Sequence, residues 1–293
     1  MNYQTITVTP AAGALGAEVS GIDLSQPLSD SVFEKIHRAF TDHMVLMFRD
    51  QTLTPAQQLA FSARFGPVCQ VPYVEPLADH PDIIAVLKEA DEQKISTFGG
   101  TWHTDFSFLA EPPAGSMLYA LEVPKTGGDT IWANMAAAYE ALSDGLKATL
   151  DGMVAIHTGA PHGTKYAPPP DMAVSRSIKM QRGDPAADGE TEHPVVRVHP
   201  VSRRKGLFIN PVYVARFKGM TEAESKPLLD YLCGHAVRPE FTCRFSWRPG
   251  SMAMWDNRCT QHLAVNDYDG QRRLLHRITI AGERPVGPDP IDR

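Results

Sequence analysis

The residues of this 293-residue chain that could hold a metal ion lie in two short stretches. In Trp102-His103-Thr104-Asp105, an imidazole and a carboxylate stand two positions apart. In an extended strand this spacing places both side chains on one face, about 7 Å apart along the backbone. The best candidate for a third ligand is His262, which ends the stretch that begins at Trp255. Two histidines and one carboxylate on one face of a metal ion, with the opposite positions open, are typical of non-haem Fe(II) oxygenases.

A histidine two positions from an aspartate also occurs in ordinary strands, as an exposed polar face or a His–Asp hydrogen bond. Support comes from Arg273 and Arg277, which share one face of a predicted strand near the end of the chain. Buried guanidinium groups need anions, and their planar fork suits a carboxylate or a sulfonate. The alternative is a solvated basic strand edge, which the neighbouring Arg272 would fit.

The elements that must position these residues are many short strands and few helices. Capping-box patterns predict helices that open near Ser31, Thr54 and Thr221, and residues 136–150 predict two shorter helices. Strand patterns cover parts of 4–24, 45–48, 83–87, 116–120, 130–132, 193–199, 206–210, 241–247, 251–255 and 273–281. The chain has no G-x-G-x-x-G and no alternation of strands with helices. We therefore predict a single domain over residues 1–293, mainly β with flanking helices.

Residues 159–192 carry Pro168-Pro169-Pro170, several glycines and mixed charge, with little periodicity. An irregular stretch of this length inside a domain is usually a lid or a disordered segment. We predict a lid that closes over the substrate and excludes water. A disordered surface insertion is the alternative.

Charge and composition limit the possible partners and the compartment. The net charge is −6 and no block of lysines and arginines is present, so we expect neither nucleic acid nor a membrane as a partner. The 4 cysteines form no C-x-x-C and are expected to be reduced thiols. The chain shows no signal-peptide pattern and no apolar run long enough to cross a bilayer. We expect a cytoplasmic protein.

Four motifs, H-T-D, G-G-D-T, W-D-N-R-x-T-Q-H and R-x-x-x-R, follow one another along the chain. In this order they resemble the Fe(II)/2-oxoglutarate-dependent dioxygenases of the taurine dioxygenase/2,4-D dioxygenase (TauD/TfdA) family. The resemblance runs from about Gly16 to Pro285. It implies a double-stranded β-helix, or jelly-roll, core. It also implies a homo-oligomer, since members of the family are often dimers or tetramers.

The resemblance assigns roles to particular residues. It implies that iron is held by His103, Asp105 and His262, that Thr130 and Arg273 bind the distal carboxylate of 2-oxoglutarate, and that Arg277 faces the anionic end of the prime substrate. The implied reaction hydroxylates a small organic anion with 2-oxoglutarate and O2, and gives succinate and CO2 as co-products. Asp105 favours hydroxylation, because related halogenases lack this carboxylate and place halide there.

The candidate substrate pocket consists of Val71, Tyr73, Phe98 and Tyr213. Taurine dioxygenases have a histidine near the second capped helix and an asparagine shortly before W-H-T-D, and this chain has neither. Its Phe65-Gly66-Pro67-Val68 looks closer to the aryloxyalkanoate dioxygenases. We therefore favour an aryloxyalkanoate-like carboxylate, with taurine, an alkylsulfonate or an alkyl sulfate as the alternative. Plain core packing is the other explanation for the pocket residues.

Two other classes of function stay open on the residues alone. One is a non-catalytic barrel that binds a small acid, which the complete set of ligand residues argues against. The other is a structural Zn(II) site, in which Arg273 would have no evident anion. Cys259 is expected to be a packed thiol. His276 is one residue out of phase with Arg277 and is expected to point to the opposite face of the strand.

Overall fold

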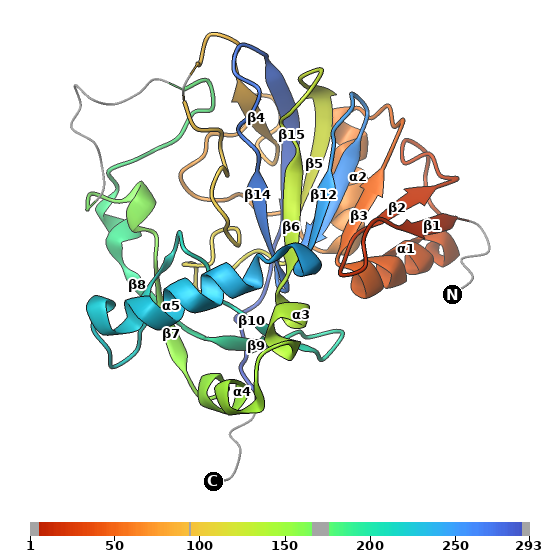
Figure 1. Ribbon diagram of the computed structural model, residues 1–293. Helices are drawn as coiled ribbons and strands as arrows, with labels where there is room; N and C mark the ends of the chain where they lie inside the picture. The colour runs from red at the N-terminus through yellow and green to blue at the C-terminus, as the bar shows by residue number, and fades with distance from the viewer. Residues whose placement is uncertain (1–5, 94, 166–175, 289–293) are drawn as a thin grey trace.

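The protein is described by a computed structural model over residues 6–93, 95–165 and 176–288 (Figure 1). Its helices are α1 (Asp30–His43), α2 (Pro55–Ser62), α3 (Met135–Glu140), α4 (Asp144–Leu150) and α5 (Glu222–Ala236). Its strands are β1 (Thr7–Pro10), β2 (Ala17–Ser20), β3 (Val45–Phe48), β4 (Ile84–Lys88), β5 (Gly115–Glu122), β6 (Thr130–Asn134), β7 (Val154–Thr158), β8 (Glu190–Pro194), β9 (Val196–Val198), β10 (Lys205–Leu207), β11 (Val214–Phe217), β12 (Thr242–Phe245), β13 (Met252–Asp256), β14 (Thr260–Ala264) and β15 (Arg273–Ile280).

The largest sheet has 7 strands in the order β1-β2-β3-β13-β5-β15-β4. Side chains alternate between its two faces, as the two-residue period of a strand requires. On β13, Ala253 and Trp255 enter one hydrophobic cluster, whereas Met252 and Met254 enter another on the opposite face. The sheet therefore separates an inner core from an outer one.

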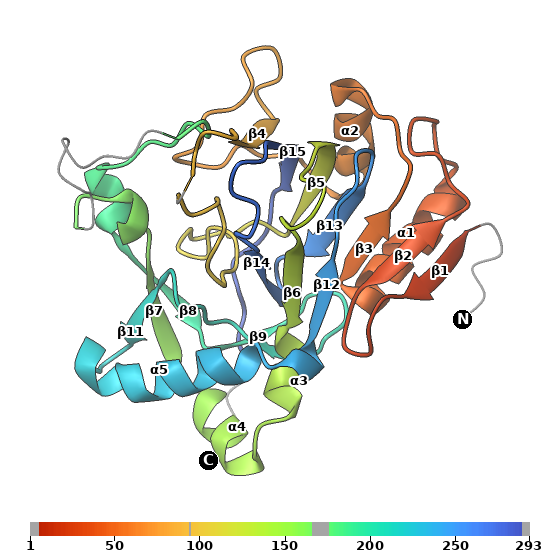
Figure 2. The same ribbon diagram turned by 45° about the horizontal axis from the view of Figure 1, so that its top comes forward.

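A smaller sheet of 3 strands, β12-β6-β14, lies across the inner core from the large sheet (Figure 2). Trp132 of β6 and Trp255 of β13 meet there with ring centroids 5.9 Å apart. Leu118 and Leu275 of the large sheet share this cluster with Phe245 of β12. Two facing sheets around one core confirm the predicted mainly β fold with a jelly-roll core.

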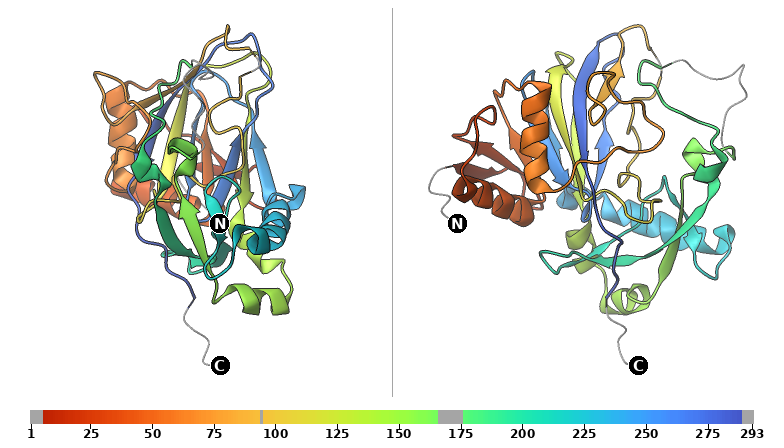
Figure 3. Two further views of the ribbon diagram at one scale, coloured as in Figure 1. Left: turned by 90° about the vertical axis from the view of Figure 1, so that its left-hand side faces the viewer. Right: turned by 180° about the vertical axis from the view of Figure 1, so that it is seen from behind.

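The outer face of the large sheet is covered by α1 and α2 (Figure 3). Ile36 and Phe40 of α1 and Phe61 of α2 are buried against it. Burying side chains of this size stabilises the fold by about 1.5–3 kcal/mol each. The N-cap of α1 is Ser29, whose hydroxyl accepts from the Val32 N–H, so the helix begins before the predicted Ser31. The capping boxes predicted at the starts of α2 and α5 are confirmed.

Helices α3, α4 and α5 form a third cluster with the sheets β11-β7-β8 and β10-β9. The sequence analysis missed β7, β11 and β14. In the predicted lid, residues 166–175 lie outside the described residues. Its described flanks contain short 3-10 turns at Ala160–His162 and Pro185–Asp188 and the first three residues of β8, so they are more regular than predicted. In the described part of the chain, no helix combines the length and apolar character that crossing a membrane needs.

Candidate metal centre

His103 and His262 face each other across a pair of backbone hydrogen bonds. The N–H of each residue donates to the carbonyl of the other, at 3.0 and 2.9 Å, and the ring centroids are 4.1 Å apart. His262 lies on β14, and His103 joins that strand through this one bridge. Asp105 opens a turn that continues to Phe108, so the predicted strand spacing of His103 and Asp105 was wrong. The turn, rather than a shared strand face, brings the carboxylate to the two imidazoles.

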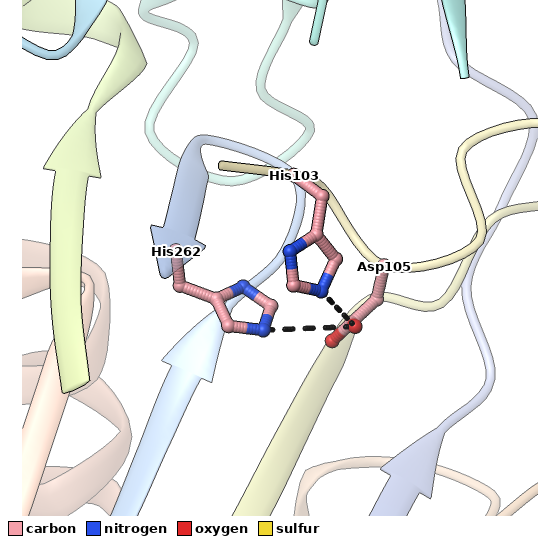
Figure 4. A group of neighbouring side chains, drawn as sticks. All are labelled: His103, Asp105 and His262. Carbon is pink, nitrogen blue, oxygen red and sulfur yellow. Dashed lines mark ion pairs between the residues drawn. The ribbon is translucent and has the colours of Figure 1, made fainter. Parts of the chain in front are cut away.

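The Nε2 atoms of both histidines point at the same carboxylate oxygen (Figure 4). Oδ1 of Asp105 lies 3.4 Å from Nε2 of His103 and 3.7 Å from Nε2 of His262. One ligand atom from each of the three residues lies within 4.8 Å of the others, and all three side chains are buried. The three predicted ligands are therefore brought together.

The ring nitrogens of His103 and His262 that face Asp105 are suited to bind a cation. Nδ1 of His103 lies 2.7 Å from the carbonyl oxygen of Thr101, so it must carry a hydrogen and donate. In the neutral ring Nε2 is then an acceptor, and it faces a carboxylate oxygen, which is also an acceptor. Burial and the neighbouring His103 lower the pKa of His262 well below its ordinary value, so the His262 ring is neutral. A metal ion with nitrogen and oxygen ligands fits this donor set.

The second oxygen of Asp105 is already held by the protein. Oδ2 lies 2.8 Å from Nη2 of Arg277 and accepts a hydrogen bond of 3.0 Å from Ser116 Oγ. Burial alone would raise the pKa of Asp105, but Arg277 and the histidines outweigh it and keep this pKa well below its ordinary value. The carboxylate is therefore ionised, with Oδ1 left as its free ligand atom.

Asn257 fixes the turn that carries Asp105, and the sequence analysis gave it no role. Its Oδ1 accepts from the Asp105 N–H at 2.8 Å, and its Nδ2 donates to the carbonyls of Asp105 and Pro113, both at 3.0 Å. The side chain is buried, and its amide replaces the backbone pairing that the turn lacks. Its position in the W-D-N-R motif was the available signal.

Arg273 and Arg277 project from the inner face of β15 into one cavity, which is also lined by Thr130, His103 and His262. Arg273 is 2% exposed, and its Nε and Nη2 have no hydrogen-bond partner among the described residues. Thr130 Oγ1 accepts a hydrogen bond of 3.0 Å from the Trp247 indole, which leaves its own hydroxyl hydrogen to donate. An unpartnered buried guanidinium beside a hydroxyl donor fits a carboxylate ligand.

A second cavity opens on the other side of His103 and Asp105. Phe98 and Tyr213 line it, as predicted for the substrate pocket. Val71 is packed in the inner core, and Tyr73 stacks on His162 with centroids 5.1 Å apart; neither is among the described residues lining the cavity. The lining residues that the sequence analysis missed include Phe106, Pro161, His162, Arg176, Met180 and Arg182. Several of these belong to the described flanks of residues 159–192, and closure of that segment over a substrate stays a prediction.

His157 and His193 contact the segment that follows Asp105. Their rings meet edge to face with centroids 5.0 Å apart. His157 Nδ1 lies 3.0 Å from Ser107 Oγ, and His193 Nε2 donates to the Leu109 carbonyl at 2.9 Å. Burial lowers the pKa of both, that of His157 well below its ordinary value and that of His193 to about 4. Both rings are therefore neutral at pH 7.

We expect the free energy of unfolding to fall as the pH drops from about 6.5 towards 4. In this interval the unfolded chain binds protons on these histidines and the folded chain does not, so protonation favours unfolding. For His193, a pKa shift from 6.5 to about 4 corresponds to ~3 kcal/mol. Urea unfolding at pH 7 and pH 5 measures the effect. His193→Gln should flatten the pH dependence, whereas His37→Gln on the exposed face of α1 should not; equal slopes would contradict this explanation.

Other groups near the site have structural explanations. His199, Asp256 and Cys259 also place three potential ligand atoms together. The Asp256 carboxylate is already occupied by Arg258 at 2.6 Å and by His199 at 2.9 Å, and burial raises the pKa of the Cys259 thiol well above its ordinary value. Cys259 is thus a packed thiol, as expected. His276 points to the outer face, where Nδ1 lies 3.3 Å from Gln58 of α2, also as expected.

Known proteins resemble this chain over nearly its whole length. The family model described as taurine catabolism dioxygenase TauD, TfdA family matches residues 7–279. An alpha-ketoglutarate-dependent sulfate ester dioxygenase from Pseudomonas putida is 39% identical over 286 residues, covering 97% of this chain and 92% of the relative. An alpha-ketoglutarate-dependent 2,4-dichlorophenoxyacetate dioxygenase from Cupriavidus pinatubonensis is 33% identical over 297 residues, covering 96% and 100%. The crystal structure of a taurine dioxygenase from Burkholderia xenovorans is 37% identical with a TM-score of 0.80, covering 97% of this chain and 94% of that chain.

Proposed function

This chain belongs to the TauD, TfdA family of dioxygenases, and we propose that it hydroxylates a small organic anion at a carbon next to the anionic group. It is an Fe(II)- and 2-oxoglutarate-dependent oxidoreductase that uses O2. One observation carries the proposal: His103, Asp105 and His262 converge beside a cavity that also contains the Arg273 guanidinium, two nitrogens of which have no partner among the described residues. Succinate and CO2 are the proposed co-products.

In this proposal His103 Nε2, His262 Nε2 and Asp105 Oδ1 hold the iron. Bound iron, together with 2-oxoglutarate and O2, supplies the oxidant for C–H hydroxylation. The chain's own contribution is to keep these three atoms fixed. Thr101 orients the His103 ring, and Arg277 with Ser116 holds the other oxygen of Asp105. Outer contacts of this kind set the direction and basicity of metal ligands.

Arg273 and Thr130 bind the distal carboxylate of 2-oxoglutarate. The carboxylate would accept from the two guanidinium nitrogens that have no partner among the described residues, and it would also accept the Thr130 hydroxyl hydrogen. Burial lowers the pKa of Arg273, although Tyr268 and Asp129 oppose this, and a bound anion would offset the same cost. A structural Zn(II) site without 2-oxoglutarate would leave this arginine without a role.

For the prime substrate we place alkyl sulfate esters first. The support is the P. putida sulfate ester dioxygenase, which shares more sequence with this chain than the 2,4-dichlorophenoxyacetate dioxygenase does. Arg277 would bind the sulfate, since it lies beside Asp105 and its Nε has no partner among the described residues. Hydroxylation of the carbon that bears the ester oxygen gives a hemiacetal sulfate. Its C–O bond then breaks, releasing an aldehyde and hydrogen sulfate.

An aryloxyalkanoate, the substrate class that the sequence favours, is the second candidate. The second cavity supports it, because the aromatic rings of Phe98, Phe106 and Tyr213 form part of its lining. Such rings suit a flat apolar body. The cytoplasmic location, the homo-oligomeric state and the single domain over residues 1–293 also stay predictions.

Succinate formation across a panel of anions tests the proposal. Fe(II)-loaded protein with 2-oxoglutarate and O2 should form succinate in proportion to added medium-chain alkyl sulfate, with equal amounts of aldehyde and sulfate released. Phenoxypropionate enantiomers, taurine and alkylsulfonates complete the panel. Stimulation by phenoxypropionates alone would favour the second candidate. Absence of succinate with every member, together with no binding of 2-oxoglutarate, would contradict the dioxygenase assignment.

Arg277→Lys tests whether Arg277 binds the anionic end of the prime substrate. It keeps a cation beside Asp105 but loses the guanidinium fork. We expect the KM for the prime substrate to rise at least about tenfold, a typical loss for a charge-assisted bidentate contact, with a smaller change in the KM for 2-oxoglutarate. If the KM for 2-oxoglutarate rises more, the roles of Arg273 and Arg277 are reversed.

A further inference from the structure

Lys88, at the end of β4, is a buried lysine next to the proposed 2-oxoglutarate pocket. It is 5% exposed and lies directly opposite Arg273 in the pairing of β4 with β15, so both side chains lie on the inner face of the sheet. Its ammonium donates three hydrogen bonds: to the Ile95 carbonyl at 2.9 Å, to Asn266 Oδ1 at 2.9 Å and to Asp269 Oδ1 at 3.0 Å. An ammonium has three N–H groups, so each has a protein acceptor.

The three acceptors belong to two loops that meet at Tyr268. The Tyr268 ring centroid is 4.9 Å from Lys88 Nζ and 6.0 Å from Arg273 Cζ, so one aromatic ring lies near both cations. The Tyr268 hydroxyl is 2.6 Å from Thr97 Oγ1 on the other loop. Tyr268 is 2% exposed. The contacts of Lys88 therefore hold this ring in place beside the Arg273 guanidinium.

The loop that Lys88 holds through Ile95 also reaches the metal ligands. Its residues Phe98 and Gly99 line both the cavity at Arg273 and the cavity at Asp105. The Gly99 carbonyl accepts from the Ala264 N–H at 2.9 Å. A β-carbon on Gly99 would lie 3.1 Å from Cε1 of His103, so the loop backbone packs closely on that ring. A shift of this loop would change the wall between the two cavities.

We propose that Lys88 is a positioning residue for the proposed 2-oxoglutarate pocket, acting on Arg273 through Tyr268 and on the shared wall through residues 95–99. The inference rests on the proposed function. General stability explains the residue less well, because replacing a buried ion pair by apolar groups is often neutral for folding. An apolar side chain at this position could not hydrogen-bond to both loops at once.

The test is 2-oxoglutarate affinity in Lys88→Met, measured without turnover. Titration calorimetry on Mn(II)-loaded protein under anaerobic conditions gives the dissociation constant of 2-oxoglutarate directly. We expect this constant to rise about tenfold or more, the size of effect that losing an outer contact of a site typically has, and Mn(II) affinity to change by less. With Fe(II) and O2, the KM for 2-oxoglutarate should rise while kcat at saturating 2-oxoglutarate stays near the parent value.

Two further variants separate positioning from folding. Lys218→Met removes an exposed lysine paired with Glu192 at 2.8 Å and should leave 2-oxoglutarate binding unchanged. Tyr268→Phe keeps the ring, removes the contact with Thr97 and should weaken binding in the same direction, even if Lys88→Met does not fold. Parent-like affinity in a folded Lys88→Met, or in Tyr268→Phe where Lys88→Met does not fold, overturns the proposal. Failure of the unmodified protein to bind 2-oxoglutarate would contradict the proposed function instead.

Discussion

The His103→Ala variant is expected to lose tight Fe(II) binding and to form no succinate above the metal-free background. The variant removes one of three converging ligand atoms, and two protein ligands do not complete the facial site. The fold should survive, because the main polar contact of the ring is with the Thr101 carbonyl of its own loop. Equilibrium dialysis with Fe(II) under anaerobic conditions, followed by succinate quantification, measures both effects.

Asp105→Ala provides the comparison, and it should lose stability as well as metal. Its removal would leave Arg277 buried without the carboxylate that lies 2.8 Å from it. An uncompensated buried charge of this kind typically costs about 3–5 kcal/mol. Normal iron content and normal turnover in the His103 variant would refute the ligand assignment, whatever happens in the Asp105 variant.

Arg273→Met is expected to weaken 2-oxoglutarate binding by ~2–5 kcal/mol, a factor of roughly 30 to several thousand in the dissociation constant. The same variant should unfold at an equal or higher denaturant concentration than the parent. The reason is that the guanidinium is buried with two nitrogens unpartnered among the described residues, so its desolvation is not offset until an anion binds. A methionine keeps the apolar part of the side chain and removes that cost.

The prediction is specific because the variant should bind 2-oxoglutarate more weakly but should be no less stable than the parent. Calorimetry with 2-oxoglutarate on Mn(II)-loaded protein measures the first quantity, and urea unfolding of the metal-free protein measures the second. Arg272 lies immediately before β15, where it is partly exposed and paired with Glu89 at 2.9 Å, so Arg272→Met is the matched control and should change neither quantity appreciably. Undiminished 2-oxoglutarate affinity in Arg273→Met would reject the assigned role.

Local signals in the sequence predicted the elements that depend on neighbouring residues. The capping boxes at Thr54 and Thr221 located the starts of α2 and α5, because a cap uses only residues three positions apart. β14 has no comparable signal. Its residues Thr260, Gln261 and His262 are polar yet buried, and they become a strand through pairing with β6, which is distant in the chain. Burial of polar residues against a site is invisible to hydrophobic periodicity.

The residues that line the cavity also show what sequence patterns cannot predict. Phe98 and Tyr213 were predicted as pocket residues, and both line the cavity. His162, Arg176 and Arg182 have no motif, and they line the cavity because the described flanks of residues 159–192 border it. Val71 has the right type but lies in the core. Side-chain type suggests which residues suit a pocket, whereas the path of the chain decides which of them reach it.

The sequence by itself determined the donor types, the family motifs and the phase of β15, since these need only residue identity and the two-residue period of a strand. Only the tertiary structure decided how each donor is used. Arg273 and Arg277 have the same side chain on the same strand face, yet Arg277 is paired with Asp105 and Arg273 has two unpartnered nitrogens among the described residues. Likewise, Oδ2 of Asp105 is occupied and Oδ1 faces the histidines. The difference arises from partners brought together by folding, because the strength and availability of a buried charge depend on what surrounds it.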